Sequence, residues 1–142
     1  ENSGVNRVLQ IAYVSRASSV LAPDDVFKII ETSARNNSRD DLTGFLIFAE
    51  NRFFQVVEGS RSAIDALLSR LGEDTRHSQI ESLSQTEIAQ RAFPNWRMKR
   101  LKPDTRIGAP IGETPGLDHF PTHLKHLVRQ FLAASQPATE AA

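Results

Sequence analysis

The 142-residue sequence predicts an α+β domain of ferredoxin-like topology, βαββαβ plus one extra strand. Apolar runs alternate with amphipathic helical segments in the order strand, helix, strand, strand, helix, strand. The turn Glu50-Asn51 joins the second and third apolar runs through two residues, which is typical of a β-hairpin. Each helical segment has one apolar face, so we expect two helices on one face of the sheet and a C-terminal helix on the other.

The elements follow one another along the chain with clear start and stop signals. The first strand is predicted at Val8–Val14, and the first helix, with proline in its first turn, at Pro23–Asn37. The two hairpin strands follow at Leu42–Ala49 and Arg52–Glu58. A second helix, which starts at serine, is predicted at Ser60–Gly72. A weaker strand is predicted at Ile80–Ile88 and a short alternating strand at Trp96–Leu101. A last helix is predicted at roughly Pro121–Ala134. We therefore expect a first domain over residues 1–101, a Pro/Gly-rich linker over 102–117 and a helical extension with a frayed tail over 118–142.

Composition excludes several classes of function. Lys plus Arg equals Asp plus Glu at 17 each, so the chain has no basic field for nucleic acid or for an anionic membrane. The absence of cysteine excludes disulfides, thiol catalysis and thiolate metal sites, and no metal site is predicted. No apolar run is long enough to cross a membrane and residues 1–6 lack a signal-peptide core, so a cytoplasmic location is expected by default.

Polar residues lie on the apolar stripe of the first predicted helix. Val26, Ile29 and Ile30 recur at helical spacing, and the next two positions of the stripe hold Ser33 and Asn37 where leucines would be expected. A polar side chain on a buried stripe costs free energy unless something hydrogen-bonds it. A frayed helix end or a local bond to the backbone explains either residue alone. Two of them one turn apart favour a polar ligand beneath the helix.

A tyrosine and a glutamine are predicted to reach the same interior volume. Tyr13, the only tyrosine, lies in the first strand, and Gln55 lies in the third. The ferredoxin-like topology places these two strands side by side, so the two side chains can be neighbours. A core Tyr–Gln hydrogen bond that holds two strands together is the simpler alternative. Together with Ser33 and Asn37, the pair indicates an apolar cleft with a few placed polar groups, which is typical of a small-molecule site.

Several short motifs occur together in one order between Val8 and about Leu101. They are Tyr13, Asn36-Asn37 with Leu42-Thr43-Gly44, Phe53-Phe54-Gln55 with Glu58-Gly59, Arg76-His77, and Phe93-Pro94-Asn95-Trp96-Arg97-Met98. In this combination the chain resembles a BLUF domain, a sensor of blue light using flavin. The resemblance implies a photoreceptor that holds FAD non-covalently, with the flavin ring between the two helices.

The resemblance also implies a role for each site residue. Asn37 would hydrogen-bond the carbonyl and imide edge of the flavin, which Ser33 would also line, and Gln55 would lie between Tyr13 and the N5/C4-carbonyl edge. The other residues implied at the cofactor are Ile29, Phe53 and Leu71 against the ring, and Arg76 and His77 near the ribityl and phosphate end. A solvated loop is the alternative for Arg76-His77. Blue light would draw an electron and a proton from Tyr13 through Gln55, whose rearranged amide would red-shift the flavin absorption.

Trp96 and Met98 are the only tryptophan and methionine of the chain. Their i, i+2 spacing predicts that both point to one face of the last strand. Core filling is the alternative for both residues. The resemblance implies that they transmit the change at the glutamine.

The apolar stripe of the C-terminal segment is the feature from which we predict how the sensor acts on other proteins. Phe120, Leu124, Leu127, Val128 and Phe131 form an apolar stripe that we expect to cover Phe54 and Val56 on the second sheet face. The 41 residues of segment 102–142 are too few for a catalytic domain, so we expect a sensor without enzymatic activity that acts through a homo-oligomer or a partner surface. A cyclic-di-GMP phosphodiesterase or a transcriptional regulator is the partner implied by family analogy.

Two other classes of protein share the predicted topology. An acylphosphatase-type enzyme would need a glycine-rich anion loop, and Ser15–Leu21 contains no glycine. A non-flavin protein-interaction domain would account for the fold but not for the polar residues at 33, 37 and 55.

Overall fold

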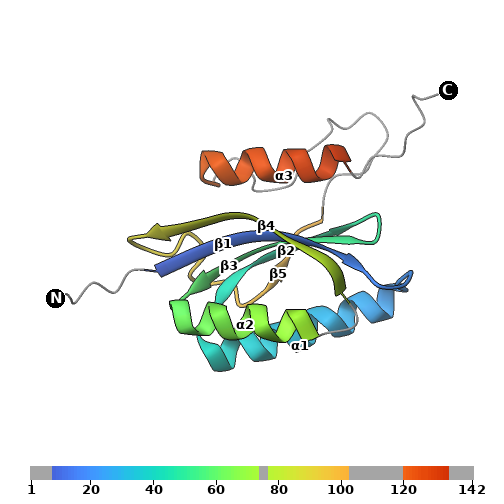
Figure 1. The fold of residues 1–142 in the computed structure, drawn as a ribbon, viewed down its shortest axis with the longest axis horizontal. Helices are drawn as coiled ribbons and strands as arrows, with labels where there is room; N and C mark the ends of the chain where they lie inside the picture. The colour runs from blue at the N-terminus through green and yellow to red at the C-terminus, as the bar shows by residue number, and fades with distance from the viewer. Residues whose placement is uncertain (1–7, 74–76, 103–119, 135–142) are drawn as a thin grey trace.

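The computed structural model describes residues 8–73, 77–102 and 120–134, which form three layers (Figure 1). Helices α1 and α2 pack on one face of a five-stranded sheet and α3 packs on the other (Figure 1). The helices are α1 (Pro23–Asp40), α2 (Arg61–Glu73) and α3 (Thr122–Ala134). The strands are β1 (Val8–Ala17), β2 (Thr43–Ala49), β3 (Arg52–Gly59), β4 (His77–Ile88) and β5 (Lys99–Arg100). The predicted ferredoxin-like fold with an extra strand and a C-terminal helix on the second face is confirmed.

The sheet has the strand order β4-β1-β3-β2-β5. Strand β1 lies between β4 and β3 and is antiparallel to both, while β5 runs parallel to β2. The predicted neighbourhood of the first and third strands is therefore confirmed, and in their register Tyr13 lies opposite Gln55. The site pair is thus fixed by the backbone ladder at the centre of the sheet.

The hairpin turn also fixes the entry to α1. Glu50 and Asn51 have φ angles of 53° and 60°, and positive φ at both positions is what a two-residue type I′ turn requires. The Asn51 side chain donates to the Ser19 carbonyl at 2.9 Å and accepts from the Leu21 backbone N–H at 3.1 Å. The loop between β1 and α1 is therefore tied to the tip of the hairpin.

Helix α1 continues three residues beyond its predicted end. It stops at Asp41, whose φ of 56° is left-handed, and the next backbone N–H, of Leu42, donates to the Asn37 carbonyl at 2.8 Å. Val26, Ile29 and Asn37 are its buried residues, and Ser33 is half-buried. The polar residues predicted to face the interior thus do so, and Asn37 is held within the last turn rather than at a frayed end.

Alternation along β3 divides the interior into two cores. Phe53 and Val57 pack beneath α1 and α2, whereas Phe54 and Val56 point to the opposite face. The second face is covered by α3, as predicted, and the buried residues that cover it are Phe120, Leu124, Val128, Phe131 and Leu132. Leu127, also predicted on this stripe, is partly buried there.

The last predicted strand is wrong in its first half. Only Lys99–Arg100 is a strand, and the residues before it form an irregular loop whose Trp96 carbonyl accepts from the Gly44 N–H at 2.7 Å. Trp96 packs with the α3-side core, and Met98 packs with the α1/α2-side core. The prediction that these two side chains share a face is therefore also wrong, because period-two alternation holds only for extended strand residues. The predicted linker, apart from residue 102, lies outside the described residues.

Candidate functional site

A cavity of about 240 Å³ lies between α1 and α2 above the centre of the sheet. It collects side chains from β1, α1, β3, α2 and the loop before β5. The lining residues are Tyr13, Thr32, Ser33, Asn36, Asn37, Gln55, Leu67, Arg70, Leu71 and Met98. The predicted polar quartet of Tyr13, Ser33, Asn37 and Gln55 thus converges on one volume, as the stripe on α1 and the strand pairing indicate.

The floor of the cavity is a tyrosine–glutamine hydrogen bond. The Tyr13 hydroxyl donates to Gln55 Oε1 at 2.8 Å, and the two residues are only 1% and 4% exposed. Burial raises the pKa of the Tyr13 phenol above its ordinary value of 10.0, so the phenol is the neutral donor in this bond. Since Tyr13 occupies Oε1, the amide Nε2 of Gln55 remains as its donor toward a ligand.

Asn37 forms one side of the cavity and keeps an acceptor without a partner. Its Nδ2 donates to the Arg97 carbonyl at 2.6 Å, while its Oδ1 is buried and has no hydrogen-bond partner among the described residues. The Arg97 side chain in turn donates to Asp41 Oδ1 at 3.1 Å, just past the end of α1. An unpaired buried acceptor costs about 1–3 kcal/mol, so this oxygen is suited to a ligand N–H.

A cation from α2 faces the acidic end of α1 beside the cavity. Arg70, a lining residue, places its Nη2 at 3.0 Å from Asp40 Oδ2. Both atoms are buried, and within the part of the chain that the structure describes neither has a partner in hydrogen-bond alignment. The pKa of the Asp40 carboxyl is lowered, first by its hydrogen bond from Arg39 and also by the charges of Arg39 and Arg70. Arg70 therefore offers an N–H group and a positive charge to a ligand that carries carbonyl or anionic oxygens.

The remaining predicted site residues lie at different distances from this cavity. Leu71 and Met98 line it, and Ile29 and Phe53 are buried in the same apolar core without being lining residues. Trp96 is on the other side of the sheet, in the α3-side core. Arg76 and the side chain of His77 lie outside the described residues, so their predicted contact with the phosphate end stays a prediction.

Four lining residues were missed from the sequence. They are Thr32, Asn36, Leu67 and Arg70. Thr32 and Asn36 flank the predicted stripe of α1 by one position each, and Leu67 stands on the apolar face already predicted for α2. Arg70 follows Leu67 by one helical turn, and this i, i+3 spacing is the signal that could have identified it.

Neither a metal site nor a membrane span is found in the part of the chain that the structure describes. Residues 8–73, 77–102 and 120–134 contain no group of three or more His, Asp or Glu side chains that could hold a metal ion. None of the helices among these residues combines the length and apolarity needed to cross a bilayer.

Comparison with known proteins identifies the class of this domain. Residues 8–99 match the BLUF family, described as sensors of blue-light using FAD, and the chain belongs to this family. The β subunit of the photoactivated adenylate cyclase of Euglena gracilis is 26% identical over 93 residues, which are 66% of this chain and 11% of that subunit. The chain therefore spans about a tenth of the length of the curated relatives that it matches first.

Solved structures agree with this assignment. A bacterial light-regulated adenylyl cyclase superposes with a TM-score of 0.68 at 27% identity, over 89% of this chain and 34% of the cyclase. BlrB, a BLUF protein solved in its dark state, superposes with a TM-score of 0.66 at 25% identity, over 93% of this chain and 99% of BlrB. The matched domain is a flavin-binding light sensor and not an enzyme, which favours the sensor over the acylphosphatase-type and interaction-domain alternatives.

Proposed function

We propose that this chain detects blue light with FAD held non-covalently in the cavity between α1 and α2, and that Tyr13 and Gln55 are its photoactive pair. The observation that carries the proposal is the buried Tyr13–Gln55 hydrogen bond at the floor of a cavity where Asn37 Oδ1 has no hydrogen-bond partner among the described residues. FAD rather than another flavin rests on the family description.

The donor and acceptor pattern of the cavity fits the edge of a flavin ring. Asn37 Oδ1 accepts, Gln55 Nε2 donates and Arg70 supplies a cationic N–H group, which match the imide N–H and the two carbonyl oxygens of the ring edge. The half-buried Ser33 hydroxyl lines the same volume. Leu71 supplies an apolar wall, and Ile29 and Phe53 pack in the core behind it.

The size of the cavity indicates which part of the cofactor it takes. About 240 Å³ is below the roughly 300–1,000 Å³ of pockets that enclose drug-sized ligands. The ring system is therefore the enclosed part, and the nucleotide tail lies toward solvent. Arg76 and His77, which follow α2 in the sequence, are proposed at the phosphate end.

The chemistry of the pair follows from its geometry. A bound flavin that has absorbed blue light supplies a strong one-electron oxidant. Tyr13 would give up one electron and its phenolic proton to that oxidant, with Gln55 as the proton relay: its Oε1 would accept the proton along the 2.8 Å bond while its Nε2 gives one up toward the cofactor. When Tyr13 recovers both, Gln55 is left rotated or tautomerised, so a different group of its amide faces the cavity. No cysteine is required, and none is present.

The output is proposed to pass through contacts with other protein chains. Trp96 and Met98 lie on the two sides of the sheet at its β2–β5 edge, and we assign them the transmission of the change at Gln55. A homo-oligomer, a cyclic-di-GMP phosphodiesterase or a transcriptional regulator is the proposed recipient.

Purification of the protein from a flavin-producing host tests the proposal. We expect a yellow protein that releases FAD on denaturation and shows a reversible red shift of its absorption under blue light. A colourless protein that takes up no added flavin would overturn the proposal, and so would a yellow protein with a light-insensitive spectrum.

A further inference from the structure

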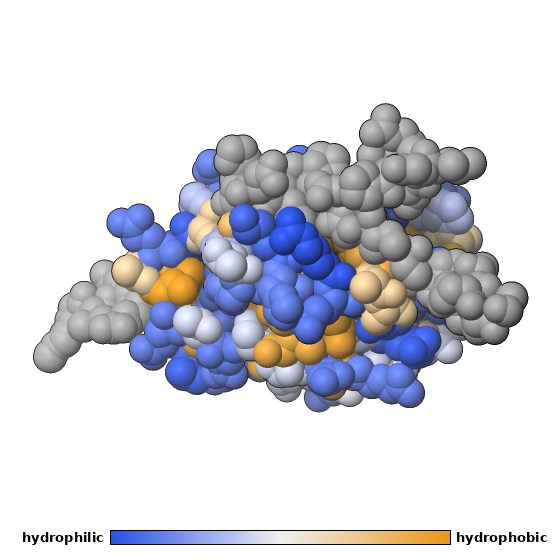
Figure 2. Space-filling view, turned by 90° about the horizontal axis from the view of Figure 1, so that it is seen from above, coloured by the Kyte–Doolittle hydropathy of each residue, from blue (hydrophilic) through white to orange (hydrophobic). Residues whose placement is uncertain are grey.

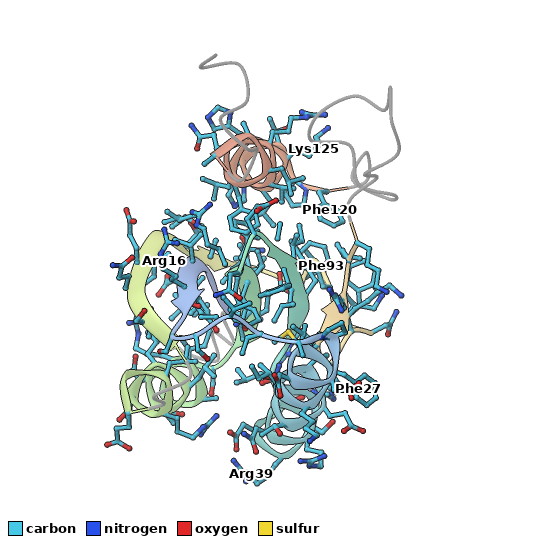
Figure 3. All side chains as sticks on the ribbon, turned by 90° about the vertical axis from the view of Figure 1, so that its right-hand side faces the viewer. Arg16, Phe27, Arg39, Phe93, Phe120 and Lys125 are labelled. Carbon is cyan, nitrogen blue, oxygen red and sulfur yellow. The ribbon has the colours of Figure 1, made fainter. Side chains whose placement is uncertain are left out.

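The loop before β5 joins the two faces of the sheet. Its Phe93 and Trp96 rings contact Phe120, at the start of the α3 segment, with centroid distances of 5.1 and 6.3 Å. Figure 3 shows Phe93 and Phe120 between the sheet and α3. Two residues beyond Trp96, Met98 lines the cavity on the opposite face. The loop therefore crosses the sheet edge within a few residues.

Hydrogen bonds hold this loop on both faces. On the cavity side, Asn37 Nδ2 donates to the Arg97 carbonyl at 2.6 Å. On the α3 side, the backbone N–H groups of Ala92 and Phe93 each donate to the Glu58 carboxylate at 2.9 Å. Glu58 is fully buried, so these are charge-assisted bonds in an apolar environment. The Glu58 carboxylate therefore holds the loop at Phe93, so that a displacement of the loop at Arg97 must strain or break these bonds.

Glu58 is also the first member of a side-chain hydrogen-bond chain that leads to α3. Gln10, on the neighbouring strand β1, donates from Nε2 to Glu58 Oε2 at 2.7 Å. The Oε1 of the same amide lies 3.0 Å from Nε2 of His123, in the first turn of α3. A carboxylate only accepts, so the Gln10 amide must direct its NH₂ to Glu58 and its oxygen to His123. His123 therefore donates to Gln10, and Gln10 donates to Glu58, so the donors of this hydrogen-bonded chain all point from α3 toward Glu58.

We propose that the chain His123–Gln10–Glu58 couples α3 to the loop of Trp96 and Met98, and that Gln10 and His123 are positioning residues for the light signal. The inference rests on the proposed photoreceptor function. The apolar contacts of α3 with the sheet are non-directional and tolerate sliding. A hydrogen bond weakens steeply when its angle or distance changes. The hydrogen-bonded chain His123–Gln10–Glu58 is therefore the part of this interface whose energy changes most when the loop shifts.

The two buried members of the chain have no role at the cavity itself. Gln10 and Glu58 are 1% and 0% exposed, and both are on the α3 side of the sheet, away from the lining residues. A buried polar network that only filled space would be no better than an apolar core, because every member must find its partners. Here the bonds lead from the backbone of the loop to His123 on α3, which is the path that a signal between them requires.

Hydrogen exchange of the flavin-loaded full chain, measured in the dark and under blue light, tests the proposal. We expect light to change the exchange of the peptide that covers residues 120–134 in the wild type. In His123→Ala this exchange rises about fivefold in the dark, for one lost hydrogen bond, and light no longer changes it. His123→Gln restores the light response, since its amide also donates to Gln10 Oε1. His126→Ala, at an exposed histidine of the same helix, is the matched control and should behave like wild type.

The outcomes separate the coupling from a structural bond and from the proposed function. If His123→Ala raised exchange equally in dark and light and kept the wild-type difference between them, the bond would be structural only and the proposal would be wrong. A wild type whose red shift is normal but whose α3 exchange is unaffected by light would also overturn it. A wild type with no red shift would instead refute the photoreceptor function on which the inference rests.

Discussion

Replacement of Asn37 by alanine tests the assigned cofactor pose. Asn37 Nδ2 donates to the Arg97 carbonyl, so only Oδ1 is available to a ligand. Asn37→Ala should therefore remove one buried hydrogen bond to the flavin. Such a bond contributes about 1–3 kcal/mol. Since about 1.4 kcal/mol corresponds to a tenfold change in affinity, the Kd for FAD should rise roughly five- to 150-fold.

The assay is titration of FAD into the apo-protein, followed by flavin fluorescence. Ser38→Ala, at the exposed neighbouring position, is the matched control and should keep the wild-type Kd. In the apo-protein, Asn37→Ala frees the Arg97 carbonyl but also removes the unpaired Oδ1, and these two effects on stability oppose each other. A separate urea titration should therefore give a free energy of unfolding within about 1 kcal/mol of wild type. A Kd within twofold of wild type would refute the reasoning, because Oδ1 would then not meet the cofactor.

Three further predictions concern the ionisable side chains Glu58, Tyr13 and Asp40. Glu58→Ala leaves three N–H donors, of Gln10, Ala92 and Phe93, without an acceptor. The free energy of unfolding measured with urea should therefore fall by about 3 kcal/mol or more, and in Glu58→Gln it should fall less. The pKa of Tyr13 is raised by burial, so its stability contribution is present below pH 10 and is lost as the pH rises further. Because Tyr13 is the only tyrosine, tyrosinate absorbance of the apo-protein should appear only together with unfolding, and its appearance in folded protein near pH 10 would contradict this. The pKa of Asp40 is lowered, so its contribution is present above its ordinary value of 3.8 and is lost as the pH falls through the folded value. Wild type should therefore lose more stability than Asp40→Asn in an acid titration, and parallel curves would count against the Arg39 and Arg70 contacts.

The parts predicted well from the sequence were those with a regular period. Helical spacing on α1 identified Ser33 and Asn37 as interior polar residues, and strand alternation together with topology brought Tyr13 to Gln55. The stripe of α3 predicted which residues would cover Phe54 and Val56. In each case a repeat of 3.6 or 2.0 residues fixes the direction of a side chain before any tertiary contact is known.

The parts predicted poorly depend on contacts between distant segments. Trp96 and Met98 separate because the loop crosses the sheet edge, where the Gly44 N–H bonds to the Trp96 carbonyl, and no local pattern encodes that crossing. Arg70 stands one helical turn after Leu67, but this spacing does not reveal that α2 approaches Asp40, which brings the Arg70 side chain to the cavity. Glu58 belongs to a short sequence motif, but its link through Gln10 to His123 joins residues that are far apart in the sequence.

The light-minus-dark absorption spectrum of Tyr13→Phe, compared with wild type, tests the central claim most directly. Phenylalanine keeps the ring volume in the core but removes the hydroxyl that donates to Gln55 at 2.8 Å. Wild type should show a reversible red shift of the flavin bands, whereas Tyr13→Phe should bind FAD with similar occupancy and show no persistent shift. Gln55→Leu should lose the shift as well, because leucine cannot relay a hydrogen bond. A Tyr13→Phe protein with bound FAD and a normal red shift would contradict the claim that this pair is the photoactive centre.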